Sequence, residues 1–231
     1  MTNQLTFYDL EVWKTFVNPG EALEVRFIKV NGRMTFSGYF DNHADFCKSV
    51  QQTGMTQHAG AYFTLQVIDP RLIGRSFNRI KQSDITTSDR DVHFYRWLPI
   101  DIDPVRPAGI SSSEAELSAA IALRDVVVEH VVTEMRFSRP IKAMSGNGTH
   151  LLFRLPDLPA NDQNKKIIKD ILADLAKLFD DNTVKIDQTV FNPARIWKLY
   201  GTYARKGDEV PAGDHREARP YRISYIDDLG E

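Results

Sequence analysis

Two carboxylates lie side by side near the middle of the chain, in residues 98–103 (LPIDID). Side chains alternate between the two faces of a strand, so Asp101 and Asp103 share one face and the apolar residues share the other. Neighbouring carboxylates repel each other unless a divalent cation lies between them, and Mg²⁺ and Mn²⁺ prefer such oxygen ligands. A pair of solvent-facing acids at a strand end would look the same. This segment alone leaves both interpretations open.

A glycine-rich turn follows in residues 145–150 (SGNGTH). Gly146 and Gly148 permit a tight turn whose backbone N–H groups could approach an anion closely. Ser145 and His150 flank the turn and could donate hydrogen bonds to phosphate oxygens. Taken alone, the segment is more typical of a hairpin turn with a surface histidine.

A third polar region begins at Asp187, which could supply another carboxylate. Basic side chains suited to a triphosphate or a template backbone follow it. They are Arg195, Lys198, Arg205 and Lys206. The alternative is a solvated basic stretch with Trp197 in the core, and for Trp197 we favour that placement over base stacking.

Composition limits the class of protein. The 231 residues carry a formal charge of −2, with 42% hydrophobic and 26% charged residues, which is ordinary for a globular protein. Cys47 is the only cysteine, which excludes an intramolecular disulfide and any zinc site that needs two thiolates. Neither a membrane-spanning run nor a signal peptide is evident, so we expect no membrane partner and a cytoplasmic location. The overall charge does not indicate tight, unaided binding of duplex DNA.

The order of predicted elements favours a mixed α+β fold. A hairpin is predicted where Asn31-Gly32 joins two β-rich runs, and a helix follows from Asp41 or Asn42 with Gly54 close after its end. A capping box at residues 113–116 (SEAE) begins an apolar-faced helix, and a second amphipathic helix covers the segment around residues 168–179. The predicted strands are 25–30, 34–40, 62–68, 94–103, 141–145, 149–155, 183–190, 195–203 and 221–226.

The chemical signals occur in a specific order between Trp97 and Gly207: two carboxylates, a Ser-Gly-x-Gly-x-His turn, one carboxylate and a basic Gly-Thr segment. This order resembles the three motifs of the archaeo-eukaryotic primase superfamily, and most closely the primase-polymerases of plasmids, phages and CRISPR-associated loci. The first ninety or so residues resemble that family only loosely.

The resemblance implies roles for individual residues. Asp101, Asp103 and Asp187 would be the catalytic carboxylates and would bind two Mg²⁺ or Mn²⁺ ions, although Asp187 could instead only orient water. The turn would contact the phosphates of the incoming nucleotide. The implied nucleotide-binding set is Ser145, Gly146, Gly148, His150, Arg195, Lys198, Thr202 and Lys206.

The resemblance also implies a fold and an activity. An N-terminal α/β module (about 1–92) would be fused to an RRM-like catalytic module (about 93–231), with the active site between them. The activity would be template-dependent transfer of dNTPs or NTPs to the 3′-hydroxyl of a primer on single-stranded DNA. A helicase or a helical priming domain is expected beyond the C-terminus in a longer protein. Two alternatives stay open: a non-catalytic nucleic-acid-binding replication initiator, and a metal-dependent nuclease.

Overall fold

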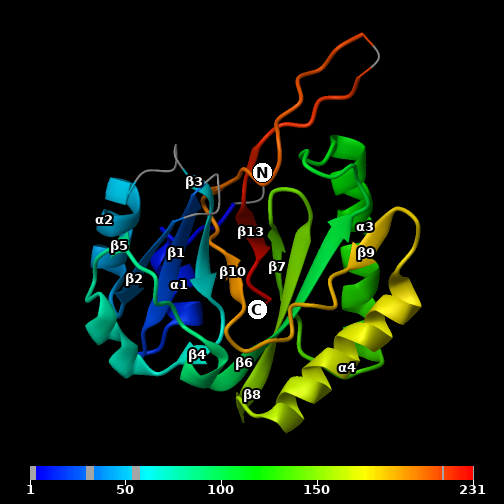
Figure 1. The fold of residues 1–231 in the computed structure, drawn as a ribbon. Coiled ribbons are helices and arrows are strands. Elements are labelled where there is room, and N and C mark those ends of the chain that lie inside the picture. The colour runs from blue at the N-terminus through cyan, green and yellow to red at the C-terminus, as the bar shows by residue number, and fades with distance from the viewer. Residues whose placement is uncertain (1–3, 30–33, 54–57, 215, 231) are drawn as a thin grey trace.

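The computed structural model describes residues 4–29, 34–53, 58–214 and 216–230, and Figure 1 shows them as two lobes packed side by side. Helices are mixed with strands that pair antiparallel within the sheets, which confirms the predicted α+β class. The predicted Asn31-Gly32 turn and Gly54 lie outside the described residues. No helix within the described ranges has both the length and the apolar character that crossing a bilayer requires.

The N-terminal lobe is built on a sheet with the strand order β10-β3-β1-β2-β5. Its strands are β1 (Leu23–Lys29), β2 (Thr35–Phe40), β3 (His58–Thr64), β5 (Lys81–Gln82) and β10 (Ile196–Lys198). Two helices, α1 (Leu10–Phe16) and α2 (His43–Thr53), and two short 3-10 helices, η1 (Pro70–Arg75) and η2 (Asp89–Asp91), belong to the N-terminal part of the chain. The predicted hairpin strands are thus confirmed as β1 and β2, which pair antiparallel.

The second lobe has the strand order β13-β7-β8-β6-β4, and β9 also pairs with β6. Its strands are β4 (Val67–Ile68), β6 (Val92–Pro104), β7 (Ile141–Met144), β8 (Thr149–Pro159), β9 (Val184–Ile186) and β13 (Tyr225–Asp228). Helices α3 (Glu114–Thr133) and α4 (Asp162–Phe179) pack on the side of this sheet away from the N-terminal lobe (Figure 1). The predicted capping box is present at the start of α3, where Ser113 and Glu116 exchange side-chain hydrogen bonds with backbone N–H groups.

The two lobes share strands and one hydrophobic core. β10 comes from the C-terminal half yet pairs with β3, while β4 comes from the N-terminal half yet pairs with β6. Between the sheets, the ring of Phe16 on α1 packs against Phe63 and Trp97 at centroid distances of 5.2 and 5.4 Å. β6 begins at Val92, and both the predicted module boundary near that residue and the RRM-like character of the second module stay predictions.

Four predicted strands are broken. The strand predicted at 221–226 divides at Ser224 into β12 (Arg222–Ile223) and β13, and the other three breaks have identifiable reasons. The predicted strand 62–68 divides into β3 and β4 around Gln66, whose buried amide bonds the backbone of Arg96 and Trp97 and so directs the chain to the second sheet. The predicted strand 183–190 ends early because the Asp187 carboxylate accepts the backbone N–H of Thr189 at 2.7 Å and begins a turn.

The predicted strand 195–203 is interrupted at Gly201, whose φ of +98° turns the chain. A short strand β11 (Tyr203–Ala204) follows and pairs with β12 (Arg222–Ile223). The residues between β11 and β12 form an arm that projects from the body of the protein, drawn in orange and red in Figure 1.

Candidate active site

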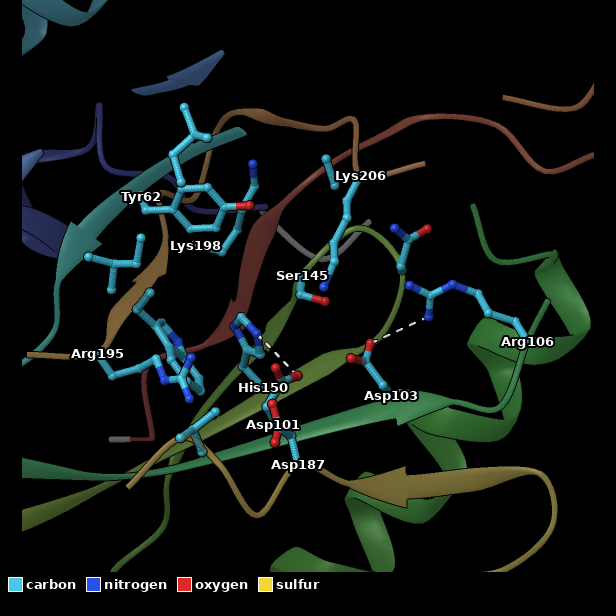
Figure 2. Close-up of a pocket in the computed structure, with 16 residues that line it drawn as sticks. Tyr62, Asp101, Asp103, Arg106, Ser145, His150, Asp187, Arg195, Lys198 and Lys206 are labelled. Atoms are coloured by element: carbon cyan, nitrogen blue, oxygen red, sulfur yellow. Dashed lines mark ion pairs between the residues drawn. The ribbon is translucent and has the colours of Figure 1, made fainter. Parts of the chain in front are cut away.

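Strand register brings three predicted site residues into one row. β6 lies between β8 and β9, and Asp101 on β6 is directly opposite His150 on β8. On the other side of β6, the backbone N–H of Asp187 donates to the carbonyl oxygen of Asp101 at 2.8 Å. Side chains of directly opposed residues point to the same face of a sheet. The row His150–Asp101–Asp187 therefore faces a single pocket between the lobes (Figure 2).

Asp103 joins this row two residues further along β6, and Gly148 leaves space for it. A Cβ atom on Gly148 would lie 2.4 Å from the carbonyl oxygen of Ile102 and 2.7 Å from Oδ1 of Asp103. Gly146 has a φ of +114°, which side-chain-bearing residues rarely adopt. The sequence correctly indicated that the turn depends on both glycines, one for its conformation and the other for close approach.

The predicted anion cradle of backbone N–H groups needs correction. The N–H of Gly146 donates to the sulfur of Met144 at 2.8 Å, and the N–H of Gly148 donates to Oγ of Ser145 at 3.1 Å. Both groups are thus occupied within the turn. Ser145 still lines the pocket, and because its oxygen acts as the acceptor, its hydroxyl hydrogen is available to a ligand.

The carboxylates have the chemistry of a cation site. Oδ1 of Asp101 is buried and makes no hydrogen bond within the described structure, and Nε2 of His150 lies 3.4 Å from it. Partial burial, together with the negative charge of Asp101, raises the pKa of Asp103 to about 6. A divalent cation at this position would give the Asp101 oxygen a partner. It would also favour ionisation of Asp103.

As the side chains stand, no group of three or more His, Cys, Asp or Glu residues in the described ranges is arranged to hold a metal ion. This is compatible with Mg²⁺, which commonly binds one or two carboxylates together with substrate phosphates instead of a cage made only of protein ligands. The residues therefore fit a cation that arrives with a phosphorylated ligand.

Positive side chains and the carboxylates line the same pocket of about 310 Å³ (Figure 2). The cations that line it are Arg106, Arg195, Lys198 and Lys206. Arg195 is held by the backbone carbonyl and hydroxyl oxygens of Thr189. Lys198 is buried, donates to the carbonyl oxygen of Tyr203 at 2.7 Å, and has its pKa lowered by burial to about 7. Lys206 extends from the base of the arm toward Ser145.

Two basic or polar candidates lie elsewhere. Thr202 is 2% exposed and its hydroxyl donates to the carbonyl oxygen of Leu199 at 2.6 Å, so it stabilises the turn and does not line the pocket. The structure does not support the prediction that Thr202 contacts nucleotide, because its buried hydroxyl is already bonded to Leu199. Arg205 is also outside the pocket, with its guanidinium carbon 5.2 Å from the ring centroid of Tyr203.

Sequence reasoning missed three polar residues of the pocket. Arg106 lies 3.7 Å from Oδ1 of Asp103, an i,i+3 spacing after the strand that could have drawn attention to it. Asn147 lies in the glycine turn itself, and its Oδ1 accepts the backbone N–H of Ser112 at 2.9 Å. Tyr62 on β3 stands directly opposite Lys198, a pairing between distant segments that no local pattern indicates.

Comparison with known proteins gives limited guidance. No family model matches the sequence, and no curated protein matches it. Among solved structures, the polymerase domain of Mycobacterium tuberculosis ligase D in complex with DNA is similar to this chain with a TM-score of 0.47 and 13% sequence identity. The match covers 94% of this chain and 78% of that one. Because this similarity is low, the function proposed below depends on the residues of the pocket.

Proposed function

We propose that this chain is the catalytic core of a primase-polymerase: a template-dependent nucleotidyltransferase that adds nucleoside triphosphates to a 3′-hydroxyl on single-stranded DNA. One observation carries the proposal. The carboxylates of Asp101, Asp103 and Asp187 line one pocket together with four basic side chains. Carboxylates that accept Mg²⁺ or Mn²⁺ beside cations that accept phosphate form a site for a metal-bound triphosphate.

The residues that would hold the metal are Asp101, Asp103 and Asp187. When bound, two divalent cations supply activation of the attacking hydroxyl and stabilisation of the leaving pyrophosphate. Every other contribution comes from the chain itself.

The basic side chains would neutralise and orient the triphosphate. Arg106 already lies beside Asp103, so it is placed to contact a phosphate at the metal end of the pocket. Arg195 and Lys198 approach from the other lobe, and Ser145 offers a free hydroxyl hydrogen. Positioning and neutralisation of this kind account for most of the catalysis in phosphoryl transfer.

Neither alternative activity, nuclease or non-catalytic nucleic-acid binding, accounts for both the acids and the bases of the pocket. A nuclease requires the carboxylates but has no need for so many cations in the same pocket, and a non-catalytic binding module requires neither the acids nor the bases in this arrangement. Cleavage and extension of the same labelled strand, measured in one reaction, separate these possibilities.

The test is primer extension on a single-stranded template with four dNTPs or four NTPs, in Mg²⁺ or Mn²⁺. Asp101→Asn and Asp103→Asn keep the side-chain shape and remove the charge, and we expect each to lower the rate roughly 10²–10³-fold or more. Binding of Mn²⁺ measured by electron paramagnetic resonance should weaken in parallel.

Asp174→Asn is the matched control, because Asp174 is an exposed acid on α4, remote from the pocket. It should extend primers at the wild-type rate. Near-normal extension by both pocket variants, or strand cleavage without extension by the wild type, would refute the proposal.

A further inference from the structure

A chain of buried hydrogen bonds lies behind the pocket and ends at His150. Nε1 of Trp197 donates to the hydroxyl oxygen of Tyr200 at 2.9 Å, and that oxygen lies 2.9 Å from Nδ1 of His150. Nε2 of His150 then faces Oδ1 of Asp101 at 3.4 Å. Tyr200 is fully buried, and the other two rings are almost fully buried.

Packing holds the three rings in this order. The imidazole of His150 lies against the indole of Trp197 with a centroid distance of 4.2 Å and contacts Tyr200 edge-on at 5.9 Å. The backbone of Tyr200 is anchored by the N–H of Phe7, which donates to its carbonyl oxygen at 3.1 Å. Tyr200 does not line the pocket, so its influence on a ligand passes through the histidine, whereas Trp197 both lines the pocket and donates to Tyr200.

The donors and acceptors in this series of hydrogen bonds determine which atoms carry the hydrogens. An indole N–H only donates, so the Tyr200 oxygen accepts from Trp197. Among the hydrogen bonds of the described residues, the one acceptor placed for the Tyr200 hydroxyl hydrogen is Nδ1 of His150. If Nδ1 carried a hydrogen instead, the Tyr200 hydroxyl would be left buried without an acceptor, which is costly. Nδ1 is therefore the acceptor, and the ring hydrogen is on Nε2.

We propose that Trp197 and Tyr200 are positioning residues that hold His150 in the Nε2–H tautomer, so that it presents a hydrogen-bond donor to the pocket. In this state Nε2 has no lone pair with which to bind a cation or accept a proton. Its partner is an anionic oxygen: the carboxylate of Asp101 or, on the basis of the function proposed above, a phosphate oxygen of the nucleotide.

The first test is spectroscopic and independent of activity. In protein labelled with ¹⁵N-histidine, long-range ¹H–¹⁵N correlation distinguishes the two tautomers, and the His150 signals are assigned by their loss in His150→Gln. We expect the Nε2–H pattern in the wild type and a mixture of tautomers in Tyr200→Phe. Trp197→Phe keeps an aromatic ring but removes the donor that orients the Tyr200 hydroxyl, so it should shift the population in the same direction.

Tyr95→Phe is the matched control, because Tyr95 is equally buried and its hydroxyl donates to the carbonyl oxygen of Phe191 at 2.9 Å. It removes one buried hydrogen bond without touching His150 and should leave the tautomer unchanged. An Nδ1–H pattern in the wild type, or an unaltered pattern in Tyr200→Phe, would overturn the positioning role.

The second test concerns the ligand. We expect Tyr200→Phe to raise the apparent KM for nucleotide roughly 10-fold with a smaller change in kcat, since it disturbs a binding donor. In a His150→Gln background, where the side-chain amide supplies a donor without tautomers, the same change should have little effect. If Tyr200→Phe raised the apparent KM equally in both backgrounds, Tyr200 would not act through His150. Failure of every preparation to incorporate nucleotide would refute the proposed function and the phosphate ligand, while the tautomer measurement would still decide the positioning role.

Discussion

Lys198 offers the sharpest physical test of the pocket, because it is a buried cation without a ligand to neutralise it. Burial lowers its pKa from 10.5 to about 7. Its ammonium group donates to the carbonyl oxygen of Tyr203 at 2.7 Å and lies 5.6 Å from the ring centroid of Tyr62. The perturbation is Lys198→Met, which keeps most of the unbranched stem and removes the charge.

The sign of the pH effect follows from the two pKa values. Between pH 7 and pH 10.5 the unfolded chain binds the Lys198 proton more tightly than the folded protein does. The free energy of unfolding therefore rises with pH through this window, by up to about 1.4 kcal/mol for each pH unit. From about pH 7.5 to about pH 9 the wild type should gain about 2 kcal/mol relative to Lys198→Met.

The same argument gives an absolute difference near neutral pH. At about pH 7.5 the folded protein holds Lys198 mostly without its proton, and giving up that proton on folding costs roughly 4 kcal/mol, while the variant loses one hydrogen bond worth about 1 kcal/mol. We therefore expect Lys198→Met to be more stable than the wild type by roughly 2–3 kcal/mol at that pH.

Urea denaturation at the two pH values measures both quantities. Lys48→Met is the control, because Lys48 is exposed on α2 and its substitution should leave the pH dependence of the wild type unchanged. If the wild type and Lys198→Met show parallel pH dependence, the lysine is solvated and the reasoning is refuted.

Ligand binding extends the test to function. A bound triphosphate would stabilise the charged form of Lys198, so nucleotide binding at about pH 8 should take up close to one proton. Calorimetry in buffers of different ionisation enthalpy measures this uptake, which should largely disappear in Lys198→Met.

Three further predictions concern other parts of the chain. Gly148→Ala should weaken Mn²⁺ binding, because the added Cβ would meet the backbone of β6 at 2.4 Å. Gly74→Ala is the control, because Gly74 has open space around it. Equal Mn²⁺ affinities of the two variants would contradict this prediction. Arg96→Met should lower the free energy of unfolding by roughly 3 kcal/mol in urea denaturation, because the buried guanidinium pairs with Glu21 and Asp157, and a loss well below 1 kcal/mol would show the pairs to be inconsequential. With a net charge of −2 the chain should extend an annealed primer but initiate poorly on bare single-stranded DNA. Each phosphate contact contributes roughly −0.7 to the slope of the logarithm of template affinity against the logarithm of salt concentration, so a few contacts give a shallow slope. A steep slope, or efficient synthesis without a primer, would refute this prediction.

The features that sequence predicted well are governed by local rules. The alternation in residues 98–103 fixed the shared face of Asp101 and Asp103, because side chains in a strand alternate whatever the partner. The capping box set the start of α3 for a similar reason. The importance of the glycine at 146 also followed from the few conformations that a tight turn allows.

The features that sequence did not predict depend on contacts between distant segments. Only the register of β6 with β8 and β9 shows that His150 and Asp187 flank the same carboxylate. The burial of Lys198 arises from the pairing of β10 with β3, which no pattern near residue 198 indicates. The assignment of Thr202 could not be checked locally, because only the folded turn shows that its buried hydroxyl bonds the carbonyl oxygen of Leu199.

The pocket draws its carboxylates and its buried lysine from opposite sheets. The carboxylates belong to β6 and to the residue after β9, while Lys198 belongs to β10, which crosses to pair with the N-terminal sheet. The acids and the bases each lie in an unfavourable environment, because burial and the charge of Asp101 raise the pKa of Asp103 and burial lowers the pKa of Lys198. A cation alone would relieve the acids but worsen the surroundings of the bases, and a polyanion alone would do the reverse. The ligand that satisfies both sets at once carries a divalent cation and several phosphates together.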